Sequence, residues 1–354
     1  MKFPIIQFEQ PAGIFYLSAL PAEEVMRISR VDPRKIDLAT METGGGVQRE
    51  PSRKRIKEIA AYADTVDAAF PTPILLALSS ADCEVDGNTM SIQNDKVADI
   101  VDGQHRVLGL SESHSIANFT LPVVLMLDAT EEQKALIFAT INGKQTKVPA
   151  SLVYDLFGVT TTRSPQKTAH EIARAMNTEQ SSPWYRRLKM LGRKTYSGSP
   201  ETLSQGTFVK FLIPQISSKP DVDLDLIKRG KKLPVREECI FNGYFRAEQD
   251  SVILKILMDV FQGARETWPN EWEDPSTYVL TKTLGFSGIM LALPRMVRAG
   301  KGVHDLSARY FGMIFAKVRT FMAREHIELT SEYFSASGSG EAEFRRIIEL
   351  QVAG

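Results

Sequence analysis

Residues 97–110 read VADIVDGQHRVLGL, and this stretch decides how the first part of the chain folds. An apolar, strand-like run stops at the DGQHR motif, residues 102–106, and a helix-like pattern follows it. Gly103 suits a backbone conformation closed to other residues, and the first N–H groups of a helix have no partner within the helix. Arg106 adds a guanidinium suited to phosphate. The pattern predicts an anion-binding corner, and hence nucleotide or polyphosphate chemistry. Because Asp-Gly is also a common tight-turn dipeptide, a purely structural turn is the alternative.

The segments before this corner alternate between helix and strand patterns. Residues 53–66, RKRIKEIAAYADTV, have apolar side chains at helical spacing, with charged ones opposite. Pro71 then forces an extended entry into the apolar run PILLALS, which predicts a strand. Residues 83–85 and 89–92 flank Asp86-Gly87-Asn88 and predict a hairpin.

The segments after the corner continue the alternation. The helix that begins at the motif is expected to end near Ser113, and residues 119–127, FTLPVVLML, predict a strand. Thr130 and Gln133 form a capping-box pattern, so a helix is expected from there to about Asn142-Gly143. The N-terminal part is therefore mixed α and β.

After Pro149 the pattern becomes helical. Helices are predicted over residues 150–157, 164–177, 203–216, 248–267, 288–297, 305–323 and 341–352. We therefore expect an α+β protein with two domains: a mixed domain over residues 1–158 and a mainly helical domain over residues 159–354.

Composition restricts the class of protein. The 43 basic residues balance the 43 acidic ones, so no global field attracts nucleic acid or anionic lipid, and any such attraction must be local. Cys83 and Cys239 lie far apart without metal-ligand spacing, which fits a reducing compartment and no zinc site. The N-terminus lacks the unbroken apolar core of a signal peptide, and no run approaches a membrane span. A cytoplasmic protein without membrane partners is expected.

Two further polar segments are candidates for phosphate binding. Gln48-Arg49 precedes a cluster of basic residues that opens the first clear helix, and a solvated helix face is the alternative for that cluster. Residues 142–147, NGKQTK, collect amides, a hydroxyl and two ammonium groups at a helix end, where ordinary capping is the alternative. Polar clusters at the ends of elements in one α/β domain can converge on one site.

Two basic segments of the helical part contain no acidic residue. They are residues 186–194, RRLKMLGRK, bracketed by Trp184, Tyr185 and Tyr196, and residues 228–236, KRGKKLPVR. Phosphate contacts with aromatic support predict nucleic-acid binding, and solvated loops or docking faces are the alternative. The candidate DNA-binding residues are Arg186, Arg187, Lys189, Arg193, Lys194, Lys228, Arg229, Lys231 and Lys232.

These motifs carry a family resemblance. RIKEIAAY, FPTPILLAL, VDGQHRVLGL and ATINGKQTKVPASLVYDLF resemble the DGQHR-domain family, which includes DndB-type proteins of bacterial DNA-modification clusters. RSPQKTAHEIA, GTFVKFL and LTKTLGF extend the resemblance over most of the chain. The N-terminal part is similar, more remotely, to the ParB/sulfiredoxin-like nucleotide-binding fold. Gln104 stands where sulfiredoxins carry a catalytic Cys, which argues against their thiol chemistry.

The resemblance implies roles for individual residues. The phosphate-binding set is Gln48, Arg49, Gly103, Gln104, Arg106, Asn142, Lys144, Gln145 and Lys147. Gln145 replaces an Arg of the ParB-like pattern, for which Lys144 or Lys147 would substitute. If a nucleotide is hydrolysed, Arg106 would stabilise charge on the phosphate, and Asp102 or His105 would orient water. Asp102 would otherwise ligate Mg²⁺ or cap the turn.

The function that the resemblance implies is nucleotide binding, with Mg²⁺-dependent hydrolysis of ATP or another nucleoside triphosphate, in a bacterial DNA-modification or defence system. The modification would be 7-deazaguanine insertion or phosphorothioation. DNA and other proteins of the modification cluster are the expected partners, and a homo-oligomer is an open alternative to a monomer. One alternative is a DNA-binding transcriptional regulator without turnover, and another is a ParB-like nicking enzyme, which needs a carboxylate-rich metal site.

Overall fold

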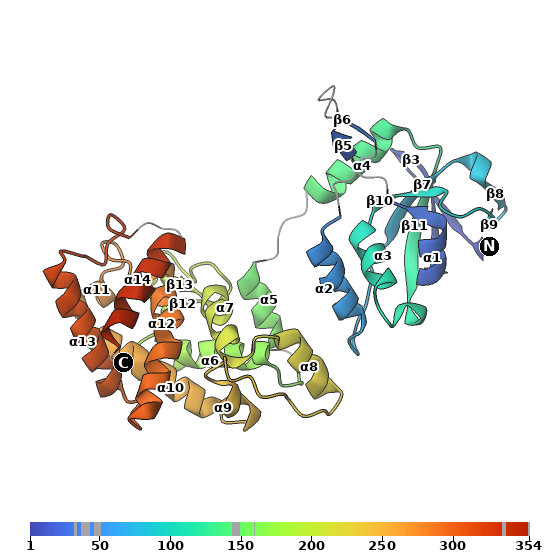
Figure 1. Ribbon diagram of the computed structural model, residues 1–354. Coiled ribbons are helices and arrows are strands. Elements are labelled where there is room, and N and C mark those ends of the chain that lie inside the picture. Colours follow the sequence, from blue (N-terminus) through green and yellow to red (C-terminus); the bar gives the residue numbers. More distant parts are fainter. Residues whose placement is uncertain are drawn as a thin grey trace. The chain divides into compact units, whose positions relative to one another are not determined.

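The computed structural model describes residues 1–31, 34–36, 43–45, 51–143, 149–158, 160–334 and 338–352, with the side chains of 34–36, 43–45 and 142–143 left out. The chain divides into two compact units, Met1–Thr146 and Lys147–Gly354. The first unit contains the larger sheets and the second is mainly helical (Figure 1).

The first unit is built on a mixed six-stranded sheet with strand order β2-β3-β11-β7-β10-β4. Its strands are β2 (Ile6–Gln10), β3 (Gly13–Pro21), β4 (Ser29–Arg30), β7 (Ile74–Leu78), β10 (Ala98–Asp102) and β11 (Thr120–Leu127). A three-stranded sheet contains β1 (Lys2–Pro4), β8 (Cys83–Asp86) and β9 (Thr89–Ile92), and β5 (Arg34–Ile36) pairs with β6 (Thr43–Gly45).

The central strands β7 and β11 are parallel, and β10 runs antiparallel to β7. All five residues of β7 are buried, as expected for a strand covered on both faces. Pro122 lies inside β11 although proline removes a ladder donor. The pairing of β11 with β7 begins only at Val123, so Pro122 lies where β11 has no β7 partner.

Helices cover both faces of the six-stranded sheet. One face, which includes Leu76, Ile100 and Val123, forms a core with side chains of α1 (Ala22–Ile28) and α3 (Gln104–Ser111). The other face, which includes Leu75 and Val101, packs against α4 (Glu131–Gly143). The helix α2 (Arg53–Ala63) packs on α3 (Figure 1).

Most sequence predictions for this unit are confirmed. The capping box at α4 is present, because the Thr130 N–H donates to Gln133 Oε1 at 2.9 Å and the Gln133 N–H donates to Thr130 Oγ1 at 3.2 Å. The hairpin forms with Gly87 at φ +55°. The strands β1 to β6 and the helix α1 were not predicted. Of these, β3 pairs with both β2 and β11, and this long-range pairing is not visible in a local pattern.

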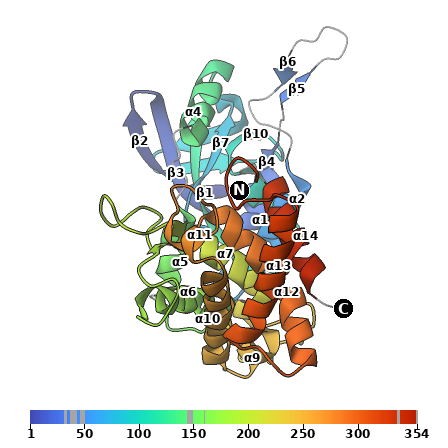
Figure 2. The ribbon, with the colours of Figure 1, turned by 90° about the vertical axis from the view of Figure 1, so that its left-hand side faces the viewer.

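The second unit consists of helices with two short strands, β12 (Leu188–Lys189) and β13 (Leu203–Ser204). Its helices are α5 (Ala150–Phe157), α6 (Pro165–Thr178), α7 (Gln205–Ile216), α8 (Pro220–Lys228), α9 (Asn242–Arg246), α10 (Asp250–Thr267), α11 (Pro269–Glu273), α12 (Thr283–Gly302), α13 (Ala308–Arg324) and α14 (Gly338–Gln351). Figure 2 shows α12, α13 and α14 packed together. The predicted helices are confirmed, α12 being longer than expected, whereas α8, α9 and α11 were not predicted.

The boundary between the units lies before α5 rather than after it, where the sequence analysis placed it. The helix α5 packs on α6 and α7, and the side chain of Tyr154 lies against the core of the second unit. That core contains a group of aromatic rings in which Trp184 contacts Phe261, Trp272 and Phe286.

Candidate functional site

The DGQHR corner forms as the sequence predicts. The strand β10 ends at Asp102, and Gly103 adopts φ +100° as the N-cap of α3. Glycine is favoured at this position by the backbone conformation, and a Cβ there would lie 2.6 Å from Ile74 Cδ1, so the Ile74 side chain would have to shift.

Arg106 is a structural clasp in this corner. Its side chain is only 18% exposed. Nη1 donates to Thr72 Oγ1 at 2.7 Å and to the Thr72 carbonyl, and Nη2 donates to the Pro73 carbonyl at 3.1 Å and to Asp102 Oδ2 at 3.0 Å. Burial lowers the pKa of the guanidinium, and the nearby Asp102 carboxylate opposes that shift. The guanidinium therefore ties the start of α3 to the segment that enters β7. The sequence analysis treated it as a turn-exposed phosphate ligand, but its donors point to acceptors within the chain.

His105 connects the N-termini of two helices. Its Nε2 accepts a hydrogen bond of 3.0 Å from the backbone N–H of Ser52, the N-cap of α2. The Ser52 hydroxyl in turn accepts from the Arg55 N–H at 3.4 Å. The positive ends of the α2 and α3 dipoles consequently lie close together, and Arg53, Lys54 and Arg55 are exposed on the first turn of α2.

The remaining candidates of this site are placed only in part. Gln104 is buried at 6% exposure. Asn142 lies at the end of α4, and nothing is described of its side chain. Gln48, Arg49, Lys144, Gln145 and Lys147 lie outside the described residues. The convergence of the three polar segments therefore stays a prediction.

Metal ligation has little geometric support in the described ranges. Among these residues no three His, Cys, Asp or Glu side chains lie close enough together to hold a metal ion. Asp102 pairs with Arg106 instead. A nicking enzyme would need such a carboxylate-rich site.

The first basic segment, residues 186–194, contains residues that are not at the surface. Arg187 is only 13% exposed, forms an ion pair with Glu273, and donates to the Trp272 carbonyl at 3.3 Å. Trp184 is fully buried, so its ring cannot stack on a base. The aromatic support that the sequence analysis expected from Trp184, and the phosphate contact that it expected from Arg187, are therefore wrong, because both side chains belong to the interior of the second unit.

The rest of this segment is more accessible. Arg186 is exposed, with its guanidinium 5.2 Å from the centre of the Tyr185 ring. Lys189 lies in β12, and Lys194 Nζ donates to the Ser199 carbonyl at 3.0 Å. Arg193 and Tyr196 are exposed. This part of the segment remains a candidate surface.

The second basic segment is exposed from Lys228 to Lys232. Lys231 and Lys232 line a hollow of about 510 Å³ together with Arg163, Arg246 and one carboxylate, Glu248. Arg163 also forms an ion pair with Asp250. Arg229 pairs with Asp225 at 2.6 Å within one turn of helix, which leaves its side chain 37% exposed. The hollow therefore collects positive charge in a chain whose net charge is zero.

The end of this segment is anchored in the interior. Arg236 Nη2 donates to Asp223 Oδ1 at 2.6 Å and Nε donates to Oδ2 at 3.2 Å, while the Ser217 hydroxyl donates to the same carboxylate at 2.5 Å. The Asp223 side chain is 1% exposed and that of Arg236 is 10% exposed. This buried pair holds the basic segment in place.

The comparison with protein families identifies the chain. The model of a family described as DndB, DNA-sulfur modification-associated, matches residues 3–190, which is more than half of the sequence. The chain belongs to the DndB family. No curated protein and no solved structure matches. The match associates this DndB-family chain with a DNA-sulfur-modification system, whereas the ParB/sulfiredoxin-like fold stays a prediction.

The extent of the match separates two parts of this DndB-family chain. It contains the DGQHR corner and ends within the first basic segment, so of the residues that line the hollow of Lys231 and Lys232 it includes Arg163 alone. Sequence reasoning missed Arg163 and Arg246 of that hollow, because each is an isolated basic residue without a local charge pattern. Within the described residues, no helix is long and apolar enough to cross a membrane.

Proposed function

We propose that this chain is a DNA-binding component of a DNA-sulfur-modification system and acts without catalytic turnover. The observation that carries the proposal is the basic hollow of Lys231, Lys232, Arg163 and Arg246 in the second unit. Membership of the DndB family supplies the link to DNA sulfur modification. Such a protein would act in the cytoplasm, where the DNA is.

The hollow has the chemistry that a phosphate backbone requires. Lys231 and Lys232 are exposed, so they can exchange counterions for phosphates at little cost to the fold. Arg246 is held beside them by a hydrogen bond of 3.1 Å from its Nε to the Leu233 carbonyl. Phosphate contacts of this kind give affinity and orientation, and base contacts would be needed for sequence specificity.

The test is duplex DNA binding measured by fluorescence anisotropy over a range of salt concentrations. Lys231→Glu/Lys232→Glu should weaken binding by about tenfold or more and reduce the slope of log K against log salt by about 2, since each phosphate contact contributes about 0.9. A matched control is Lys255→Glu/Arg309→Glu, which changes the charge of the second unit equally at residues outside the hollow.

The control should change DNA affinity only by the long-range effect of charge, with the slope unchanged. If both variants lose the same DNA affinity, the loss comes from the change in net charge and not from the hollow. An unaltered salt slope in Lys231→Glu/Lys232→Glu would place the DNA contact elsewhere. Thermal unfolding of each variant checks that the fold is retained.

Nucleotide binding at the DGQHR corner is the second candidate function. The observation that favours it is the Ser52 N–H to His105 hydrogen bond, which brings the N-termini of α2 and α3 together. ATP or another nucleoside triphosphate would bring Mg²⁺ on its own phosphates, because Asp102 is already paired with Arg106. The Arg106 clasp makes hydrolysis the weaker proposal, since a guanidinium engaged by three residues of the chain is not free to stabilise a phosphoryl transition state.

This second function is tested by calorimetric titration of ATP with Mg²⁺ and by phosphate release. Arg55→Glu reverses an exposed charge on the first turn of α2 and should abolish saturable ATP binding if the paired helix N-termini hold the phosphates. Lys57→Glu, two residues further along the same helix and beyond its first turn, should weaken binding less, because the effect of the helix dipole is confined to the first turn. Equal affinity in wild type and Arg55→Glu would exclude this site.

A further inference from the structure

The last helix, α14, lies between α12 and α13 and has a hollow on each side. On the α12 side the hollow measures about 470 Å³, and on the α13 side about 600 Å³. Both lie within the second unit and beyond the part of the chain that the family match covers. We call the two hollows, together with the helix α14 that separates them, the α14 face.

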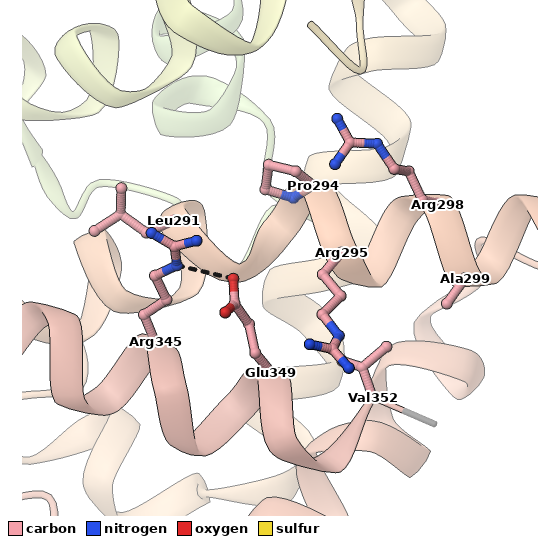
Figure 3. A pocket seen from close by; sticks show the side chains of 8 residues that line it. All are labelled: Leu291, Pro294, Arg295, Arg298, Ala299, Arg345, Glu349 and Val352. Carbon is pink, nitrogen blue, oxygen red and sulfur yellow. Dashed lines mark hydrogen bonds and ion pairs between the residues drawn. The ribbon is translucent and has the colours of Figure 1, made fainter. Parts of the chain in front are cut away.

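The α14 face is strongly basic. The first hollow is lined by Arg295 and Arg298 of α12 and by Arg345 of α14, and the second by Lys317 and Arg324 of α13. Glu349 is the single carboxylate among the residues that line the two hollows, and it accepts from Arg345 Nε at 2.8 Å. Figure 3 shows the Arg295 side chain extending toward α14 beside Val352, while Arg345 and Glu349 meet on α14.

Apolar side chains lie between these cations. Leu291, Pro294, Ala299 and Val352 line the first hollow, and Ala316, Phe321 and Leu350 line the second. Leu350 is 57% exposed, although a leucine on a helix that packs against two neighbours usually turns inward. The face thus combines positive charge with uncovered apolar surface.

This combination fits a protein segment better than a nucleic acid. A phosphate backbone would pair with the guanidinium groups but would leave Leu350 and Phe321 against polar groups. An acidic amphipathic helix offers apolar side chains to the hollows and carboxylates to the arginines at their rims. Arginine and aromatic residues are enriched in protein–protein interfaces, whereas lysine is depleted, and four of the five cations here are arginines.

We propose that the α14 face docks an acidic amphipathic helix of another protein. The apolar side of that helix would cover Leu350 and Phe321, and its carboxylates would form bidentate pairs with Arg295 and Arg345. The partner helix would bind in the helix-in-groove manner, in which apolar side chains about one helical turn apart insert into the groove. This interaction is separate from the proposed DNA contact at Lys231 and Lys232, because the two surfaces share no lining residue.

The test uses the full chain and a fluorescein-labelled model peptide of about 20 residues, a length that spans about 30 Å as a helix. The peptide carries leucines on one face and glutamates on the other, and a second peptide has lysines in place of the glutamates. The acidic peptide should bind saturably and the basic one should not. Arg295→Glu/Arg345→Glu should lower the affinity for the acidic peptide by about tenfold or more. Lys255→Glu/Arg309→Glu, which changes the charge equally, should lower that affinity by less than about twofold.

A second variant separates a protein partner from DNA. Leu350→Ser removes exposed apolar surface without changing charge. It should therefore lower the affinity for the acidic peptide several-fold and leave the affinity for duplex DNA unchanged. Hydrogen exchange with bound peptide should protect residues of α12, α13 and α14.

Three results would overturn the proposal. They are the absence of saturable binding of the acidic peptide, a loss of DNA affinity in Arg295→Glu/Arg345→Glu with peptide affinity unchanged, and self-association of the wild type that this double variant abolishes. The second result would assign the face to nucleic acid, and the third to another copy of this chain. None of them depends on the outcome for Lys231→Glu/Lys232→Glu.

Discussion

Arg106 Nη2 donates to Asp102 Oδ2 at 3.0 Å, which closes the two ends of the DGQHR motif on each other across Gly103. Both residues were candidates for chemistry on a phosphate. The pair instead neutralises two partly buried charges, with side chains 18% and 29% exposed, and the remaining guanidinium donors reach Thr72 and Pro73. The motif thus joins β10, α3 and the start of β7 into one rigid corner.

The first prediction concerns this clasp. Arg106→Ala should destabilise the first unit by about 2–4 kcal/mol, because it leaves the partly buried Asp102 carboxylate and two carbonyls without their donor. Urea unfolding of the full chain measures the change. Arg106→Lys keeps the charge but not the fork of donors, so it should recover only part of the loss. A stability equal to that of wild type would mean that Arg106 is available to a ligand after all.

The second prediction concerns Gly103. Gly103→Ala should cost about 2–4 kcal/mol, because it adds both left-handed strain and a Cβ 2.6 Å from Ile74 Cδ1. Gly87→Ala is the matched control, since Gly87 also has positive φ but has no atom within 4 Å of an added Cβ. It should cost about 1 kcal/mol, from backbone strain alone. Similar losses in the two variants would show that Ile74 moves aside.

The third prediction concerns the buried pair of Asp223 and Arg236. Arg236→Ala should cost about 3–5 kcal/mol in the stability of the second unit, because it leaves a carboxylate of 1% exposure unpaired. Limited proteolysis should then cut the basic segment faster, since its end is no longer anchored. Lys255→Ala breaks a pair in which the lysine is 75% exposed and should cost at most about 0.5 kcal/mol. An equally small loss for Arg236→Ala would contradict the anchoring role.

The fourth prediction concerns His170, which is 3% exposed on α6. Burial lowers its pKa below the usual 6.5; Asp155 and Glu171 oppose this shift, whereas Arg174 reinforces it. The unfolded chain therefore binds a proton more readily than the folded one, so unfolding free energy should decrease as the pH falls through 6.5 toward the lowered pKa of the folded state. Unfolding at pH 7.5 and at pH 5.5 measures this effect. His170→Gln should reduce the difference in unfolding free energy between the two pH values. If that difference is unchanged in the variant, the pH dependence comes from other groups.

Much of the fold was predictable because its signals are local. The capping box at Thr130 and Gln133 and the hairpin at Gly87 each depend on residues that are close together in the sequence. The strand β3 was not predicted, because it is defined by pairing with β11, about a hundred residues later in the chain. The helix α1, which follows β3 directly, was not predicted either.

The candidate site was less predictable. Arg106, Arg187 and Lys231 are all basic residues within polar motifs. The two arginines are largely buried in ion pairs within their units, whereas Lys231 is exposed. A charge pattern records which groups are present but not which acceptors they meet. The arginines of the α14 face lie on three different helices, α12, α13 and α14, so no single segment revealed them.

By itself, the sequence determined the class of the protein, the strand–turn–helix corner at Gly103, and the succession of helices after Pro149, because propensity, capping and periodicity act over a few residues. Only the tertiary structure decided which charged side chains are buried in clasps and which remain for a partner. That choice depends on distant carbonyls and carboxylates, such as those of Thr72, Asp223 and Glu273, that folding brings within hydrogen-bond distance.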